Sequence, residues 1–172
     1  MRPADGGPGR VDGLTDRQMS APETSMPAPA PALGADGWFT TDPEPALVGH
    51  RCPQCATVAF PRPPLGCPNP ACPSDEMEPT PLSRRGRIWS YTDARYEPPP
   101  PYVRPTEEHV PFCIAAVELP AERIVVLGQV VAGVSVDDLT VGQEVEVVVD
   151  TLFVDDEAEH QIFKWQPVEV AR

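Results

Sequence analysis

Four of the five cysteines of this 172-residue sequence stand close together as two pairs. Cys52 and Cys55 form a C-x2-C pair, and Cys67 and Cys72 form a C-x4-C pair. Thiolates paired on two short turns can surround one divalent ion tetrahedrally, because each turn supplies two ligands without fixing a long loop. The spacing therefore predicts a metal site of the zinc-ribbon type, with these four cysteines as ligands.

Other chemistries of these cysteines agree less well with the surrounding residues. A thioredoxin-like C-P-x-C pair needs a helix that begins at the motif and lowers the pKa of the first thiol. The residues after Cys55, ATVAFPRPP, are instead β-branched and rich in proline. Iron fits the same four-thiolate cage, so the spacing leaves zinc and iron both open. His50 is an alternative ligand, although four thiolates make it unnecessary.

The first residues hold no apolar run of the kind that forms a signal peptide, and no apolar stretch elsewhere is long enough to span a membrane. We therefore expect a cytoplasmic protein without a membrane partner. Thiols stay reduced in that compartment, which favours a metal site over disulfides.

The charge balance argues against nucleic acid as a partner. The sequence has 13 Lys and Arg against 26 Asp and Glu, which gives a formal net charge of −13. Such a chain repels phosphate backbones. Proline is abundant at 25 residues, so we expect loops, turns and extended segments rather than long helices.

The composition changes along the chain and predicts three parts. Residues 1–36 are mostly Pro, Ala, Gly, Ser and charged residues, which bury too little apolar surface to offset the entropy of ordering, so we predict a disordered tail. Residues 37–81 hold an apolar lead-in, Trp38 and Phe39, and then the ribbon. We expect the two aromatic residues to pack on the following domain, with burial on a partner as the alternative. Residues 82–172 form the third part.

The pattern of apolar and polar residues in the third part, 82–172, predicts a mainly β domain. Five segments alternate apolar and polar residues or form dense apolar runs, which is typical of strands. Five short strands almost without helix favour a five-stranded Greek-key barrel of the OB type, since a sandwich usually needs seven. The five predicted strands are residues 85–96, 110–120, 122–131, 141–153 and 160–168.

Alternation within the first of these strands predicts which side chains share a face. Ile88, Ser90 and Thr92 should lie on one face, with Trp89 and Tyr91 on the other.

Two features of the later barrel segments carry predictions of their own. Gly128, inside the third strand, indicates a bulge or a sharp bend. Residues 135–139, SVDDL, are the helical candidate, and they give one turn at most. Val145, Val147 and Val149 should share one face of the fourth strand.

The sequence offers no recognisable catalytic group, so we predict no catalytic residues. The three histidines, His50, His109 and His160, are scattered, and no Ser/His/Asp or Cys/His arrangement stands out. Cys113 lies in an apolar strand, where a cysteine is usually a small buried hydrophobic residue.

The succession of motifs resembles a known family. A cysteine ribbon is followed by LSRRGRIWSYT, YEPPPPY, VPFCIAAVELPAERIVVLGQVV, DLTVGQEVEVVV and FKWQPV. Over residues 37–172 this order is similar to the zinc-ribbon/OB-fold acyl-CoA-associated proteins, domain-of-unknown-function family 35. Members accompany thiolase-superfamily enzymes, as in benzoylsuccinyl-CoA thiolase and the steroid side-chain aldolases. The resemblance implies that the ribbon cysteines hold structural zinc and that the carbon–carbon chemistry belongs to a larger subunit.

A basic segment within the acidic chain is a candidate for contact with coenzyme A. Arg84, Arg85 and Arg87 can offer guanidinium groups to its phosphates, and Tyr96 stands beside a proline-rich loop. The alternative for the arginines is ion pairing or simple solvation. The loop, residues 97–105, is pre-ordered enough to project into a partner or over an acyl channel, or it is an exposed spacer.

The sequence and the resemblance together predict a non-catalytic, zinc-containing subunit of a hetero-oligomer. It would dock on a thiolase-superfamily large subunit and help to form or gate the acyl-CoA site, supporting cleavage or formation of carbon–carbon bonds. The alternatives are a nucleic-acid-binding ribbon and OB protein, or a rubredoxin-like electron carrier.

Overall fold

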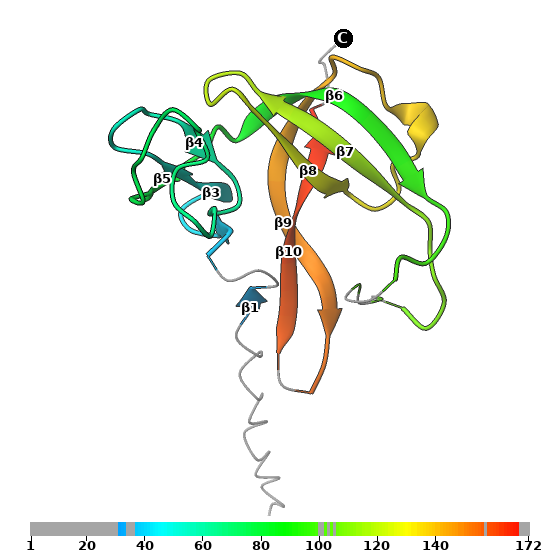
Figure 1. Cartoon of the computed structure of the whole chain (residues 1–172). Helices are drawn as coiled ribbons and strands as arrows, with labels where there is room; N and C mark the ends of the chain where they lie inside the picture. The colour runs from blue at the N-terminus through cyan, green and yellow to red at the C-terminus, as the bar shows by residue number, and fades with distance from the viewer. Residues whose placement is uncertain are drawn as a thin grey trace, which may run out of the picture.

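The structure is a computed structural model in which a small ribbon lies beside a larger β-barrel (Figure 1). The first strand, β1 (Pro31–Leu33), pairs in parallel with the last, β10 (Glu159–Pro167). Of the predicted tail 1–36, these three residues form a strand, and the others lie outside the described residues. Described are the backbone of residues 31–33 and residues 37–99, 102, 104, 106–156 and 158–168.

The ribbon is a small antiparallel sheet with β3 (Ala46–Arg51) at its centre. β2 (Phe39–Thr40) pairs with the start of β3, and β4 (Val58–Ala59) pairs with its end. β5 (Glu78–Pro81) runs along the other side of β3. Strands β3 and β4 therefore lie on either side of the first cysteine pair.

Five strands close into the predicted barrel. Around it the order is β10, β8, β7, β6 and β9, and β9 pairs with β10 to complete the circle. Among these five strands, β8 pairs with β10 in parallel, through Gln129–Lys164 and Val130–Trp165. This is the topology of an OB fold. The strands are β6 (Arg85–Ala94), β7 (Phe112–Leu119), β8 (Ile124–Val130) and β9 (Glu144–Val154), with β10 as given above.

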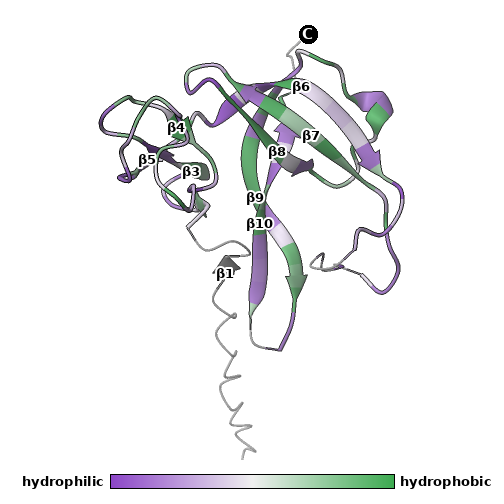
Figure 2. Ribbon diagram, viewed as in Figure 1, coloured by the Kyte–Doolittle hydropathy of each residue, from purple (hydrophilic) through white to green (hydrophobic). Residues whose placement is uncertain are grey.

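One hydrophobic core fills the barrel and extends into the ribbon. Figure 2 shows the hydrophobic residues that run along β7 and β9. Trp165 is fully buried at the centre, and the Phe163 ring beside it meets the Phe39 ring edge-on at 6.3 Å. Phe39 therefore packs on the barrel as expected. Trp38 stays partly exposed and contacts the Phe60 ring at 5.7 Å.

A β-bulge in β6 overturns the predicted faces of that strand. Ile88 lies opposite Val117 and Ser90 opposite Ala116, so Trp89 is an extra residue in β6. An extra residue moves every later side chain to the other face. Ile88 is buried, whereas Trp89 and Ser90 are both exposed, so the expectation that Ile88 and Ser90 share a face was wrong.

Gly128 does not mark a bulge. The β7–β8 ladder continues through the pair Ala115–Gly128 without a shift in register. A Cβ atom at this position would lie 2.7 Å from Cε2 of Phe163 and 2.8 Å from Nε1 of Trp165. The predicted bulge is therefore wrong, whereas the alternative, a sharp bend, stays a prediction. The close approach of two aromatic rings explains the glycine.

Two other barrel predictions are confirmed. Val145 and Val147 are fully buried, and Val149 packs against the core. The helical candidate is a single 3-10 turn, η1 (Val136–Asp138). Within the described ranges, the helices are too short and polar to cross a membrane.

Candidate functional site: a four-cysteine metal centre

The structure brings the four predicted cysteines together. Their Sγ atoms all lie within 4.8 Å of one another. The Cys52–Cys72 and Cys55–Cys67 Sγ distances are 3.7 and 3.5 Å. A tetrahedral ion with Zn–S bonds of about 2.3 Å places its sulfurs about 3.8 Å apart, whereas a disulfide needs about 2.05 Å. All four are free thiols, and their spacing fits a four-thiolate ion.

The first cysteine pair lies on the tight turn between β3 and β4. The Cys52 N–H donates to the Thr57 carbonyl, and the Ala56 N–H donates to the Cys52 carbonyl, both at 2.9 Å. Ala56 adopts a left-handed conformation with φ of 59°, which the turn requires and which glycine would adopt at lower cost. The backbone thus fixes the direction of both thiols.

The second pair is held by a wider loop that closes on itself. The Cys67 N–H donates to the Ser74 carbonyl and the Cys72 N–H to the Asn69 carbonyl, both at 2.9 Å. The Asn69 side-chain oxygen also accepts the Ala71 N–H at 3.0 Å. The four-residue spacing of this pair is therefore compatible with two converging thiols.

Local hydrogen bonding prepares one ligand for metal binding. Cys55 Sγ lies 3.1 Å from the Thr57 hydroxyl, and hydrogen bonding with the Thr57 side chain and backbone lowers the pKa of Cys55 to about 6. The thiolate is the form that binds metal. His50 lies outside the cluster. Burial lowers the pKa of its imidazole, and the positive charge of Arg62 lowers it further, by a smaller amount.

The chemistry of the donor set points to a structural role. Four thiolates suit zinc or iron and leave no open coordination position for a substrate. Arg51 and Arg123 line a cleft of about 430 Å³ next to Cys55. Neither makes an ion pair within the described part of the chain, so both can offset the charge of the thiolates.

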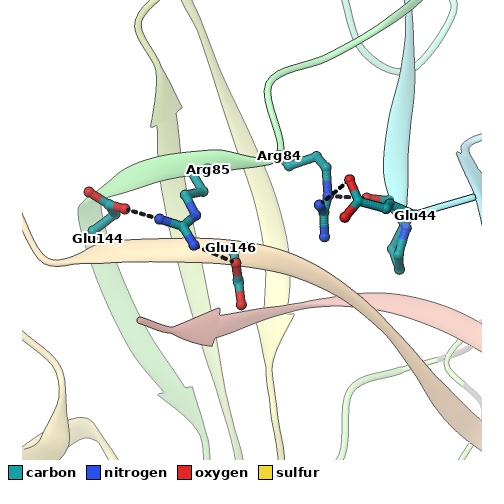
Figure 3. A network of polar contacts seen from close by, with 6 residues as sticks. Glu44, Arg84, Arg85, Glu144 and Glu146 are labelled. Atoms are coloured by element: carbon teal, nitrogen blue, oxygen red, sulfur yellow. Dashed lines mark hydrogen bonds and ion pairs between the residues drawn. The ribbon is translucent and has the colours of Figure 1, made fainter. Parts of the chain in front are cut away.

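Two of the predicted coenzyme A contacts make ion pairs within the chain (Figure 3). Arg84 lies 2.7 Å from a Glu44 oxygen and donates to the Pro45 carbonyl at 2.8 Å. Arg85 lies 3.2 Å from Glu144 and 3.3 Å from Glu146. Arg84 thereby ties the barrel to the segment that precedes β3.

The other two predicted contacts lie apart from each other. Arg87 is exposed near the start of β6 and makes no ion pair with a described residue. Tyr96 is exposed two residues beyond the end of the same strand. The structure therefore does not gather Arg84, Arg85, Arg87 and Tyr96 into one cluster.

A residue that the sequence analysis did not single out connects the two modules. Glu122, in the turn between β7 and β8, accepts hydrogen bonds from the backbone N–H and the hydroxyl of Ser83, both at 2.9 Å. Ser83 lies between ribbon and barrel. The partners are 39 residues apart, so no local sequence pattern signals the contact.

The fold and the site define a class of protein in which a four-cysteine ribbon precedes an OB barrel. Residues 79–150 match the family described as the C-terminal OB-fold domain of ChsH2. Through its barrel, the chain is similar to this family, in agreement with the resemblance seen in its sequence.

Curated relatives agree with this assignment. The chain is 43% identical over 49 residues to benzoylsuccinyl-CoA thiolase subunit BbsA of Thauera aromatica, covering 28% of this chain and 32% of that protein. It is 34% identical to BbsA of Geobacter metallireducens, over 60% of this chain and 61% of the relative. A DUF35 domain-containing scaffold protein of Methanocaldococcus jannaschii is 32% identical, over 59% and 66%. The chain thus spans from one third to two thirds of the length of these relatives.

A solved structure is similar as well. The Ltp2-ChsH2(DUF35) aldolase matches with a TM-score of 0.54 and 26% sequence identity. The match covers 71% of this chain and 84% of the other. The similarity therefore extends beyond the matched family domain.

Proposed function

We propose that this protein is a non-catalytic subunit that docks on a thiolase-like enzyme and helps to form or gate its acyl-CoA site. The observation that carries the proposal is the shared barrel. Two relatives are named as subunits of benzoylsuccinyl-CoA thiolase, and the similar solved structure is named as an aldolase that contains ChsH2. The complex would cleave or form carbon–carbon bonds in acyl-CoA thioesters.

The environments of the histidines and of Cys113 support a non-catalytic role. His109 Nε2 lies 2.9 Å from the Ala94 carbonyl, and His160 Nε2 lies 2.8 Å from an Asp155 oxygen. Cys113 is buried, and burial raises the pKa of its thiol. Among the described residues, no hydrogen bond pairs a histidine with a cysteine or serine, as a nucleophile and its base would be paired.

In this proposal Cys52, Cys55, Cys67 and Cys72 hold a zinc ion that maintains the ribbon. The ion would cross-link the two turns that carry the cysteine pairs, and a ribbon of this size needs such a cross-link in order to fold. The predicted coenzyme A contacts remain part of the proposal. Of the three arginines, Arg84 and Arg85 make ion pairs within the chain, whereas Arg87 makes none with a described residue.

The test is co-expression with a thiolase-like protein encoded beside this chain. We expect the two proteins to elute together in size-exclusion chromatography and the thiolase-like protein to need this chain for full turnover of its acyl-CoA thioester. A thiolase-like protein that elutes alone and is fully active without this chain would contradict the proposal. Oligonucleotide bound to the purified chain would instead support a nucleic-acid-binding role.

A further inference from the structure

The outer surface of β6, β7 and β8 carries large apolar side chains that the protein's own core does not use. The exposed fractions of Trp89, Leu127 and Val125 are 63, 69 and 47%. These three residues, with Ala116 between them, are called the Trp89 face below. Such a group of exposed apolar side chains on one surface is characteristic of an interaction site.

Strand pairing places these residues on one surface. Ala116 of β7 lies opposite Leu127 of β8 on one side and opposite Ser90 of β6, next to Trp89, on the other. With strands about 4.8 Å apart, Trp89 and Leu127 stand about 10 Å from each other across β7. The side chain between them, that of Ala116, is small.

The bulge is what turns Trp89 outward. Its neighbours Ile88 and Tyr91 point towards the core, so the extra residue exposes an indole without disturbing the barrel interior. Bulges often re-aim a side chain in this way. A solvent-exposed tryptophan on a rigid strand loses little conformational freedom when a partner covers it. Tryptophan is also enriched among the residues that contribute most of the binding energy of an interface.

We propose that the Trp89 face is the surface on which the thiolase-like large subunit binds. This inference rests on the proposed function and adds the place of contact. The partner surface would be apolar at its centre, with a pocket or flat area for the indole of Trp89.

The charges beside the face specify the rim of the partner. Arg87, Glu118 and Val125 form the next row across the three strands. Arg87 and Glu118 are both exposed, and neither makes an ion pair within the described ranges. A basic group of the partner opposite Glu118 would complement this rim, while Arg87 would face the negative charge of the acyl-CoA as proposed above. Both charges would border the apolar centre, as in typical interfaces.

The size of the face favours a larger partner over a second copy of this chain. Trp89, Leu127 and Val125 together present about 350 Å² of surface. A specific complex buries about 800 Å² on each partner. The face alone falls well short of this area, so the partner must also cover the rim, for which a large subunit offers more surface than a second copy of this chain.

The experiment compares variants of the full chain co-expressed with the neighbouring thiolase-like protein. We expect Trp89→Ala to weaken the complex at least tenfold in Kd, and Leu127→Ser to weaken it further in the double variant. Both side chains are exposed, so the melting temperature of the isolated chain should stay unchanged. Val154→Ser is the matched control, because Val154 has the same exposed fraction of 63% as Trp89 but lies outside the face.

The outcomes separate the two proposals. If the wild-type chain does not bind the thiolase-like protein, the proposed function itself fails. If the wild type binds and Trp89→Ala binds equally well, the Trp89 face is not the interface, while the proposed function stands. If Trp89→Ala abolishes self-association in light scattering but leaves binding of the thiolase-like protein unchanged, the face joins two copies of this chain and the inference is overturned.

Discussion

At the scale of single residues, Gly128 of β8 shows how closely the barrel is packed. A methyl group added there would lie 2.7 Å from Phe163 and 2.8 Å from Trp165, and both rings are buried. We expect Gly128→Ala to lower the free energy of unfolding by about 2–3 kcal/mol, because the rings cannot move aside without strain. Urea denaturation followed by tryptophan fluorescence measures this loss.

Gly133→Ala provides the comparison for that measurement. Gly133 has a φ of 84°, but an added Cβ meets no atom within 4 Å. Its replacement should cost only the backbone term of about 1 kcal/mol. Equal losses in the two variants would mean that the contact with the aromatic rings does not explain Gly128.

The cysteines give a second prediction for single residues. Cys67→Ser removes one of four ligands, so we expect the bound metal to fall from one ion per chain to almost none, as elemental analysis of the purified protein would show. Cys113→Ser is the control because Cys113 is the fifth cysteine and lies in the barrel core. It should keep the full metal content even if it lowers stability.

At the scale of elements, the bulge in β6 is an insertion that the barrel does not need for its own packing. Deleting Trp89 would restore regular alternation, with Ile88 and Tyr91 still facing the core. We expect this deletion to change the melting temperature by only a few degrees. Deleting Tyr91 instead leaves the bulge and brings Thr92, which is exposed, to the core-facing position opposite Ala115. That variant should melt much lower, and similar melting of the two would contradict this view of the bulge.

The same elements show which features a sequence can predict. Alternation placed Val145 and Val147 correctly because β9 runs regularly through them. It failed at Trp89, since an extra residue leaves no mark in a pattern of apolar and polar side chains. The cysteine cluster was predictable because its spacing is local. The ion pair of Arg85 with Glu144 was not, because 59 residues separate them.

At the scale of the whole molecule, ribbon and barrel share one core. Phe39 and Leu47 of the ribbon belong to the same buried cluster as Phe163 and Trp165. The Arg84–Glu44 ion pair and the Glu122–Ser83 hydrogen bonds add polar links. The division of the chain into two domains at residue 82 therefore stays a prediction. Because the ribbon and the barrel share one core, we do not expect them to unfold independently.

This shared core predicts that metal at the cysteine cluster stabilises the barrel as well as the ribbon. We expect calorimetry of the metal-loaded chain to show a single transition. Removing the metal with a chelator should lower that transition as a whole, because a loosened ribbon withdraws Phe39 and Leu47 from the barrel core. In a variant that carries Trp38→Phe and Trp89→Phe, the remaining Trp165, fully buried in the barrel, reports the same event by fluorescence. Two separate transitions, with the Trp165 signal unchanged by the chelator, would show that the ribbon and the barrel fold independently.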